Sequence, residues 1–542
     1  MNKVAVKEKI LIELKQIAHE LGLEKEVIFT EPKSYADFAT SLAMGNKGRN
    51  PQEVAKEIIA KLEPKKAELF IGKIEVAGPG FLNFFLSENS LVQGLSEVLK
   101  LGSNYGRGNK SGKINVEFVS ANPTGFLHIG HARNAAIGST LANILEFSGM
   151  TVEREYYIND AGNQINMLAN SVFARYQQLF DQNFPMPEEA YHGEDIIWAA
   201  EEFHKKYGDK FKGATLTPDV LKIFKDDSLS LFLAEIERDL KRFGVWFDTW
   251  YSERSLYNDD SKIIKEAIKK LNNVYEKDGA TWLRTTASGD DKDRVLIKSN
   301  GEYTYFTPDI AYHNIKFNKT GGQDGIVMDV WGGDHSGYVK RMQIAMENLG
   351  HKPENLIILC MQLVRLMKNG EEFKMSKRRG TTFFLREFLD LVGKDSARFI
   401  LLDRTFNSKL DFDIEIATSK TNDNPAVLVQ YANARAKTLL SKSNYKLEEL
   451  IPEKYDLQTD EKLINTILEF PEVVQKSADK YLTNMLTQYL IKLAKEFNSW
   501  YSNTDKIIGN ENEKSLLALV RAVNITIENG MKLIGIEILE NM

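Results

Sequence analysis

The sequence predicts a multidomain α/β protein, with a central domain built on a parallel sheet, an α+β domain before it and an all-helical bundle after it. The central part alternates apolar, β-rich runs with polar or glycine-rich turns and helical stretches, as in a parallel sheet with crossover helices. Beyond about residue 424 only helical periodicity remains. A chain of 542 residues has room for three or four domains of ordinary size. We therefore expect domains at 1–105, 112–420 and 424–542.

The composition narrows the class of protein. Hydrophobic residues make up 43% of the chain and charged residues 27%, which is typical of a globular protein. Charged residues interrupt the N-terminal stretch and every long apolar run, so we expect no signal peptide and no membrane contact. The single cysteine, Cys360, excludes an internal disulfide and a cysteine-based zinc site, which is typical of a cytoplasmic protein. The net charge of −6 argues against indiscriminate coating of nucleic acid but leaves local basic patches open.

The N-terminal domain combines two helical patterns, at 4–23 and 51–62, with short β-rich runs at 70–76 and 81–86. A glycine-containing stretch at 104–111 has the composition of a linker to the next domain. Taken alone, these residues predict a folding unit with no role of its own.

The central domain opens with a strand, a tight loop and a helix. The run Lys113 to Val119 is rich in β-branched residues, and Pro123 and Gly125 then break regular structure. A helix follows, and its first turn contains His128 and His131. Because a helix N-terminus presents unpaired N–H groups and a partial positive charge, it stabilises an anion by roughly 0.3–1 kcal/mol.

Two interpretations of this histidine pair stay open from the local residues alone. A His-x-x-His pair also occurs on solvated helix faces, in caps and in metal sites. A metal site needs further ligands, and neither a His-Glu-x-x-His pattern nor a nearby cysteine is present. Gly130 costs about 1 kcal/mol relative to alanine in a helix. That cost favours a site where a ligand approaches the backbone closely.

A second, basic stretch changes the interpretation. Lys374-Met375-Ser376-Lys377 alone predicts a solvated loop. Together with His128-Ile129-Gly130-His131, it resembles the paired signature of the class I aminoacyl-tRNA synthetases. The resemblance implies a Rossmann-like catalytic domain that binds ATP, with His128, His131, Lys374 and Lys377 as catalytic residues. The ATP-binding residues that it implies are Pro123, Thr124, Gly125, His128, Ile129, Gly130, His131, Asp334, His335, Met375, Ser376 and Lys377. The extended motif comprises Ala121, Asn122, Pro123, Thr124, Gly125, Phe126, Leu127, His128, Ile129, Gly130 and His131.

Further sequence motifs resemble those of one class I family, the arginyl-tRNA synthetases. Tyr305-x-x-x-Asp309 follows a hairpin-like turn, and Glu117 and Asn122 are spaced as in that family. The phrases at 78–83 and 430–435 extend the likeness over almost the whole chain. The arginine-binding residues that it implies are Glu117, Ser120, Asn122, Tyr305 and Asp309. A carboxylate takes a guanidinium through a bidentate pair, which suits Asp309 and Glu117 to the charged groups of arginine.

The family resemblance also assigns the remaining segments. The helical and charged interval at about 171–285 predicts an insertion in the nucleotide fold, and it is short for an editing domain. A pocket that satisfies the five guanidinium donors rejects other amino acids by roughly 10⁴ or more without editing. The resemblance implies that the N-terminal domain contacts the outer corner of tRNA and that the C-terminal bundle binds the anticodon. The chain ends Glu540-Asn541-Met542, where the family usually has Glu-Arg-Met.

The implied activity is arginine–tRNA ligation by a monomer, with L-arginine, ATP and tRNA(Arg) as partners. Mg²⁺ is expected from the chemistry of ATP, and the sequence contains no dedicated metal site. Two alternatives remain. One is another class I synthetase, or a nucleotidyltransferase that shares the His-Ile-Gly-His motif. The other is a non-enzymatic RNA-binding relative, which normally requires decay of one signature, whereas both are intact here.

Overall fold

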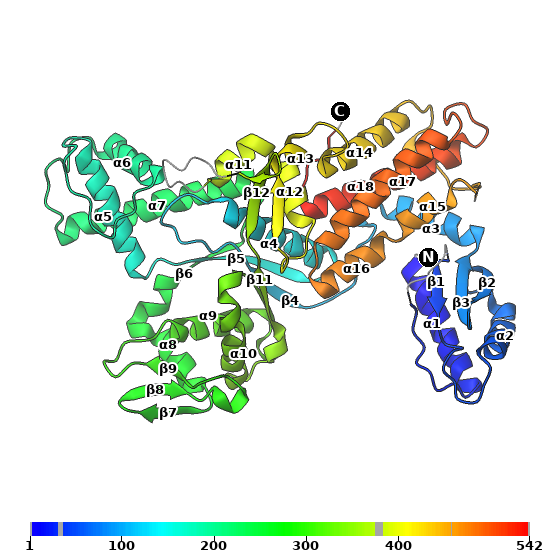
Figure 1. Ribbon diagram of the computed structural model, residues 1–542, viewed down its shortest axis with the longest axis horizontal. Coiled ribbons are helices and arrows are strands. Elements are labelled where there is room, and N and C mark those ends of the chain that lie inside the picture. Colours follow the sequence, from blue (N-terminus) through cyan, green and yellow to red (C-terminus); the bar gives the residue numbers. More distant parts are fainter. Residues whose placement is uncertain (1–2, 31–35, 374–382, 457, 540–542) are drawn as a thin grey trace.

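The computed structural model describes residues 3–30, 36–373, 383–456 and 458–539. Figure 1 shows a small N-terminal unit, a central α/β part with two lateral lobes, and a helical bundle that packs along the central part. The predicted fold class is confirmed, since a parallel sheet lies between a small α+β unit and an all-helical bundle.

The N-terminal unit packs two helices against a small antiparallel sheet with the order β1-β3-β2. Helix α2 begins after Asn50, whose side-chain oxygen accepts the Gln52 N–H, and Val54, Ile58 and Leu62 bury one helical face. The elements of this unit are α1 (Lys3–Glu20), β1 (Phe38–Thr40), α2 (Pro51–Leu62), β2 (Ile71–Ala77) and β3 (Phe81–Leu86). Helix α3 (Glu88–Leu101) follows and packs against the C-terminal bundle.

The central sheet has five parallel strands in the order β11-β10-β4-β5-β6. Strand β4 lies in the middle, because the chain first builds β5 and β6 on one side of it and later β10 and β11 on the other. In an open sheet of this kind, ligands bind beyond the carboxyl ends of the strands at such a switch point. The elements are β4 (Lys113–Glu117), α4 (Ile129–Phe147), β5 (Thr151–Ile158), β6 (Thr249–Ser252), β10 (Ile326–Gly332) and β11 (Leu356–Met361).

The interval 171–285 differs from the predicted insertion. Its first part is helical, but β6 lies inside it and pairs with β5 as an edge strand of the central sheet. The four residues of β6, Thr-Trp-Tyr-Ser, are too few for a period-2 pattern to stand out in the sequence. A second lobe then follows, with an antiparallel sheet of order β7-β8-β9.

In Figure 1 the first lobe lies at the upper left of the central part and the second lobe at the lower left. The first lobe contains α5 (Asn163–Gln178), α6 (Glu194–Tyr207) and α7 (Pro218–Arg242). The second contains η3 (Glu253–Tyr257), α8 (Asn258–Lys270), β7 (Val274–Lys277), β8 (Ala280–Leu283), β9 (Arg294–Ile297), α9 (Phe306–Thr320), η6 (Gly333–Tyr338) and α10 (Val339–Asn348).

A third small sheet, of order β13-β12-β14, connects the central part to the bundle. Its elements and the helices beside it are β12 (Val364–Lys368), β13 (Glu371–Glu372), α11 (Leu385–Val392), α12 (Lys394–Leu402), β14 (Leu410–Asp413) and α13 (Ile414–Thr418). The bundle comprises α14 (Pro425–Ser441), α15 (Glu461–Leu468), α16 (Phe470–Lys480), α17 (Asn484–Asn503) and α18 (Glu513–Ile534).

Helix α18 is the central element of the bundle. It packs against α14 and α17 and reaches both α3 and α4. Its Asn529 amide donates to the carbonyls of Gly102 and Tyr105, at 2.9 and 3.1 Å, so the segment after α3 is fixed to the bundle. Among the described residues, no helix combines the length and the apolar composition that crossing a bilayer requires.

The cap of α14 supports a first prediction. The buried Asn424 accepts the Ala426 N–H through its side-chain oxygen, and its amide donates to Ser396 Oγ and to the carbonyls of Ala417 and Ser419. We expect Asn424→Ala to lower the free energy of unfolding by about 2–3 kcal/mol, because it removes a cap and leaves buried acceptors unpaired. Chemical denaturation monitored by circular dichroism measures this loss.

Asn50→Ala provides the matched control. Asn50 caps α2 in the same way, but its surroundings are exposed, so we expect its replacement to cost about 1 kcal/mol or less. If the two variants lost the same free energy of unfolding, the buried contacts of Asn424 would add nothing beyond its helix cap, which would contradict this prediction.

Candidate active site

The site begins where β4 ends. Val119 and Ser120 adopt positive φ angles of 67° and 39°, which cost of order 1–3 kcal/mol each for residues with a side chain. Two side chains hold this turn. Asn134 on α4 accepts the Val119 N–H at 2.7 Å and donates to the Val330 carbonyl at 2.8 Å, while Ser120 Oγ donates to Glu117 at 2.9 Å. The turn after β4 is therefore fixed to both α4 and β10.

The first predicted motif caps helix α4. His128 Nδ1 accepts the Gly130 N–H at 3.1 Å, and His131 Nδ1 accepts the His128 N–H at 3.2 Å. Each Nδ1 therefore carries no proton, and each ring presents an Nε2–H donor. A Cβ at Gly130 would lie 2.8 Å from the His128 ring, so this cap itself requires the glycine.

Both histidines are neutral in this arrangement. Burial lowers the pKa of His128, and burial together with His128 lowers the pKa of His131 to about 3. The pair therefore offers hydrogen bonds rather than positive charge.

The expectation that the helix N-terminus has unpaired N–H groups is wrong for its first residues. The Ile129 N–H donates to the Phe383 carbonyl at 3.0 Å, and those of Gly130 and His131 donate to His128. The donors left for an anion here are the two imidazole Nε2–H groups.

The loop between β4 and α4 contains Pro123, Thr124 and Gly125 and lies against the first lobe. Asp195, at the start of α6, accepts the Phe126 N–H at 3.2 Å, and a Cβ at Gly125 would lie 2.3 Å from its carboxylate. The first lobe therefore supports the motif from outside the sheet.

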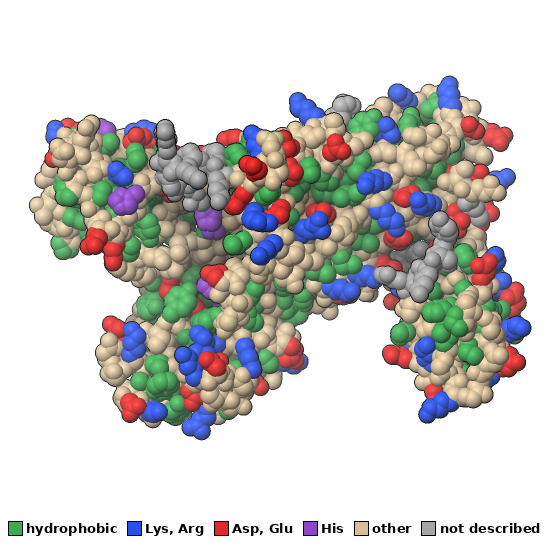
Figure 2. Space-filling view, viewed as in Figure 1, with side chains coloured by type: hydrophobic (Ala, Val, Ile, Leu, Met, Phe, Trp, Pro, Cys, Tyr) green, Lys and Arg blue, Asp and Glu red, His purple; other side chains and the backbone are tan. Residues whose placement is uncertain are grey.

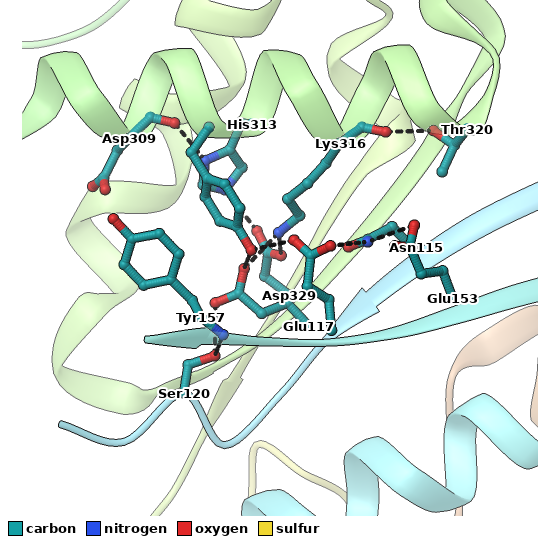
Figure 3. Close-up of polar contacts among 12 residues, drawn as sticks. Asn115, Glu117, Ser120, Glu153, Tyr157, Asp309, His313, Lys316, Thr320 and Asp329 are labelled. Carbon is teal, nitrogen blue, oxygen red and sulfur yellow. Dashed lines mark hydrogen bonds and ion pairs between the residues drawn. The ribbon is translucent and has the colours of Figure 1, made fainter. Parts of the chain in front are cut away.

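A buried charge network lies beneath the carboxyl end of the sheet (Figure 3). Lys316 on α9 is fully buried, and its Nζ lies 2.7 Å from Glu117 on β4 and also pairs with Asp329 on β10. The Tyr312 hydroxyl, one turn earlier, lies 2.9 Å from Glu117 and 2.5 Å from Glu155 on β5. One face of α9 is thus fixed to three neighbouring strands. The predicted arginine-binding residue Glu117 takes part in this network.

His313 adds a second cation to the network. Its Nε2 lies 2.8 Å from the Asp329 carboxylate and its Nδ1 lies 2.7 Å from the Asp309 carbonyl. Neither oxygen has a proton to donate, so both ring nitrogens donate and the ring is an imidazolium. Burial lowers the pKa of His313, but the charge and hydrogen bond of Asp329 together with the charge of Asp309 raise it above its usual value.

Two further carboxylates have no cationic partner among the described residues. Asp309 accepts the Tyr338 hydroxyl at 2.9 Å, and burial raises its pKa to about 6. Glu253, at the start of η3, is buried, and its Oε2 has no hydrogen-bond partner. Burial, Asp309 and Asp160 raise the pKa of Glu253 to about 7. An unpaired buried carboxylate is costly, so this arrangement favours a cationic ligand.

The other predicted residues lie in the segments that follow β4 and β10 and directly before α9. Asn122 accepts the Asn159 amide at 3.1 Å, and the Tyr305 ring is 63% exposed just before α9. Asp334 and His335 follow β10 in η6, with exposed side chains. The predicted residues Lys374, Met375, Ser376 and Lys377 lie outside the described residues.

Sequence reasoning missed several residues that the structure brings into the site. These are Glu253, Tyr312, His313, Lys316, Asp329 and Tyr338. A signal existed for α9, because Asp309, His313 and Lys316 recur at helical spacing in a helix with few apolar alternatives on that face. Asp329, a charged residue inside the apolar run of β10, was a second signal. No local signal pointed to Glu253.

Comparison with known proteins identifies the family. A model of the "tRNA synthetases class I (R), catalytic domain" matches residues 94–413. An "Arginyl tRNA synthetase N terminal domain" matches residues 5–86, and a "DALR anticodon binding domain" matches residues 429–542. The chain belongs to the arginyl-tRNA synthetase family.

Individual relatives agree with this assignment over their full lengths. The arginine–tRNA ligase of Metamycoplasma arthritidis is 48% identical over 99% of this chain and 100% of its own. That of Bacillus licheniformis is 42% identical over 99% of both chains. A crystal structure of a Campylobacter jejuni arginyl-tRNA synthetase is 32% identical, covers 84% of this chain and 100% of its own, and has a TM-score of 0.78. The Thermus thermophilus arginyl-tRNA synthetase, 21% identical over 99% of this chain and 100% of its own, shares the fold with a TM-score of 0.73.

The buried network supports a second prediction. We expect Lys316→Met to lower the free energy of unfolding by about 3–5 kcal/mol, because it leaves Glu117 and Asp329 buried without their shared cation. Lys319→Met is the matched control. Lys319 is partly exposed, and the buried Glu155 keeps the Tyr312 hydroxyl and the Asn115 amide when Lys319 is removed, so we expect a smaller loss of about 1–2 kcal/mol. Urea denaturation of both variants measures the difference, and equal losses would contradict the special position of Lys316.

Proposed function

We propose that arginine–tRNA ligation takes place at the carboxyl ends of β4, β5 and β10, with arginine bound at the acidic pair and ATP beside the histidines. The activity follows from family membership. An arginine–tRNA ligase activates L-arginine with ATP to arginyl-adenylate and pyrophosphate, and then transfers arginine to the 3′ end of tRNA. The observation that carries the site assignment is the pair of carboxylates, Asp309 and Glu253, without a cationic partner among the described residues.

The acidic pair suits a guanidinium. Glu117, Asp329 and Glu155 each pair with a lysine, whereas Asp309 and Glu253 form no ion pair with any residue that the structure describes, so a ligand with a permanent positive charge would balance them. A guanidinium can donate to two carboxylates at once through its planar set of N–H groups. In this proposal Tyr305 covers the guanidinium, while Asn122 and Ser120 orient the α-amino and α-carboxyl groups. Glu117 contributes negative potential and holds Ser120 rather than pairing directly with the guanidinium.

The ATP end has a different character. The Nε2–H groups of His128 and His131 donate to phosphate oxygens as neutral donors. Asp334 and His335 lie near the ribose and adenine in this proposal. Lys374 and Lys377 supply the positive charge for the departing pyrophosphate, with Met375 and Ser376 between them. Because the histidines are neutral, these two lysines would provide most of the positive charge that neutralises the phosphates.

The chemistry follows from this placement. A carboxylate oxygen of arginine attacks the α-phosphorus of ATP, the bond from that phosphorus to the bridging oxygen breaks, and pyrophosphate leaves with its electron pair. The protein contributes orientation and electrostatic stabilisation of the phosphoryl group. In the second step a terminal ribose hydroxyl of tRNA attacks the activated carbonyl, and AMP leaves.

Mg²⁺ would come with ATP in this proposal. Among the described residues, no group of three or more His, Cys, Asp or Glu side chains is placed to hold a metal ion. Mg²⁺ commonly binds mainly through substrate phosphates, so we derive no step through a protein-held ion.

The proposed tRNA contacts follow the predicted domains. We propose that residues 1–105 contact the outer corner of tRNA(Arg), that 112–420 hold its 3′ end and that 424–542 bind the anticodon. On the face shown in Figure 2, Lys and Arg side chains are interspersed with Asp and Glu over the bundle and the central part. Basic side chains are therefore available to contact phosphates despite the net charge of −6. A cytoplasmic monomer is the form that we propose.

A third prediction tests the arginine site. In ATP–pyrophosphate exchange with tRNA present, screened across amino acids, we expect exchange with arginine. We expect Asp309→Asn to raise KM for arginine about 10²-fold and Glu253→Gln about 10-fold, because each removes a charge that faces the guanidinium. KM for ATP should stay within about twofold. Glu302→Gln is the control, since this carboxylate pairs with Lys298 at an exposed turn. Unchanged KM for arginine in both site variants would refute the assignment.

A fourth prediction concerns pH. The pKa values of Asp309 and Glu253 are raised to about 6 and about 7, so these groups bind protons in the empty site below about pH 7. A guanidinium favours their ionised forms, and arginine binding must therefore release protons there. We expect KM for arginine to rise about 10-fold or more between about pH 8 and about pH 6. KM for ATP should change less, because the lowered pKa values keep both histidines neutral. A pH-independent KM for arginine would contradict this site.

A further inference from the structure

Arg133 is a buried cation near the ATP end that the proposed chemistry does not use. It lies on α4, two residues after His131, and is fully buried. Among the described residues, its guanidinium donates to backbone carbonyls alone: Nη1 to Gln362 at 2.9 Å and to Ser408 at 2.8 Å, and Nη2 to Thr405 at 3.0 Å. Burial lowers the pKa of Arg133 to about 10.

The three carbonyls belong to two loops that carry the third sheet. Gln362 lies directly between β11 and β12, while Thr405 and Ser408 precede β14. Strands β12 and β14 pair in parallel, and the loops also contact each other through the Gln362 N–H and the Phe406 carbonyl, at 3.0 Å. Arg133 therefore fixes the base of the β12-β13-β14 sheet to the first turns of α4.

The described residues that precede 374 and those that follow 382 both contact α4 or the motif at its start. On one side are β12 and β13, whose base Arg133 holds. On the other side the backbone of 383–385 pairs with the motif itself, since the Ile129 N–H donates to the Phe383 carbonyl at 3.0 Å and the Leu385 N–H donates to the Leu127 carbonyl at 2.7 Å.

We propose that Arg133 is a positioning residue for the activation step, which sets the β12-β13-β14 sheet against the histidine turn of α4. This inference rests on the proposed ATP site. A planar guanidinium is suited to this role because its fixed fork reaches two loops at once, whereas the single ammonium of lysine has no such fork. Errors of about 1 Å in the placement of reacting groups can cost about 10²-fold in rate.

Arg133→Lys tests the role, with Arg398→Lys as the matched control. Arg398 is also fully buried, and it donates to the carbonyls of Ile534 and Phe243, at 2.8 and 3.2 Å, and to hydroxyls on the later part of α4. Both variants should lose stability. In ATP–pyrophosphate exchange assays with tRNA and arginine present, we expect only Arg133→Lys to lower kcat, by about 10-fold or more, and to raise KM for ATP. KM for arginine should stay within about twofold in both variants.

Equal kinetic effects in the two variants, or an Arg133→Lys enzyme with unchanged kcat and KM for ATP, would overturn the proposal. A failure of the wild type to support arginine-dependent exchange would instead remove the proposed function.

Hydrogen exchange of the wild-type protein keeps the proposal testable if the variant does not fold. On adding ATP, we expect slower exchange at 127–133 together with slower exchange at 362–368 and 405–413. If ATP protected only 127–133, the proposed role of Arg133 would be wrong, whereas the proposed ATP site would still stand. Absence of protection at 127–133 would remove the ATP site, and this inference with it.

Discussion

The buried ammonium of Lys316 is the interaction on which the site depends. It pairs with Glu117 on β4 and Asp329 on β10, at the place where the order of strands reverses. Carboxylates buried side by side would repel each other and take up protons without such a cation. Because Lys316 belongs to α9, charge balance also fixes α9, and with it Asp309, above the carboxyl ends of the strands.

The same balance explains why the remaining charge is selective. Lys316, His313 and Lys319 pair with Glu117, Asp329 and Glu155, whereas Asp309 and Glu253 form no ion pair among the described residues, and the His313 imidazolium only partly offsets the effect of burial on Asp309. A neutral or anionic side chain would leave these groups uncompensated. A cation that can donate to both would restore balance. In the proposed site, specificity for arginine would rest on the negative charge of Asp309 and Glu253, which the protein does not neutralise with an ion pair among the described residues.

The sequence predicted what is local and missed what is long-range. The strand, loop and helix around His128 were predictable because propensity and turn residues act within a few positions. Lys316 and Glu117 are 199 positions apart, and Glu253 meets Asp309 only because β6 joins the sheet from inside a mainly helical interval. The four residues of β6 are too few to show a period-2 pattern of hydrophobic residues. The sequence therefore predicted neither the position of β6 in the sheet nor the place of Glu253, which follows it. Asp309 itself was assigned through family resemblance, and the reason for its selectivity required the structure.

The two ends of the site differ in electrostatic character, and this difference separates the substrates. In the proposed site, the acidic pair would repel the phosphates of ATP and so disfavour ATP at the arginine position. The histidine turn carries no charge, because each Nδ1 is used by a backbone N–H, so it neither attracts a carboxylate strongly nor repels a guanidinium. Neutral donors alone are weak against a polyphosphate. In the proposed site, the positive charge that completes the ATP end comes from outside the histidine turn, and the placement of the β12-β13-β14 sheet against α4 would then affect activation.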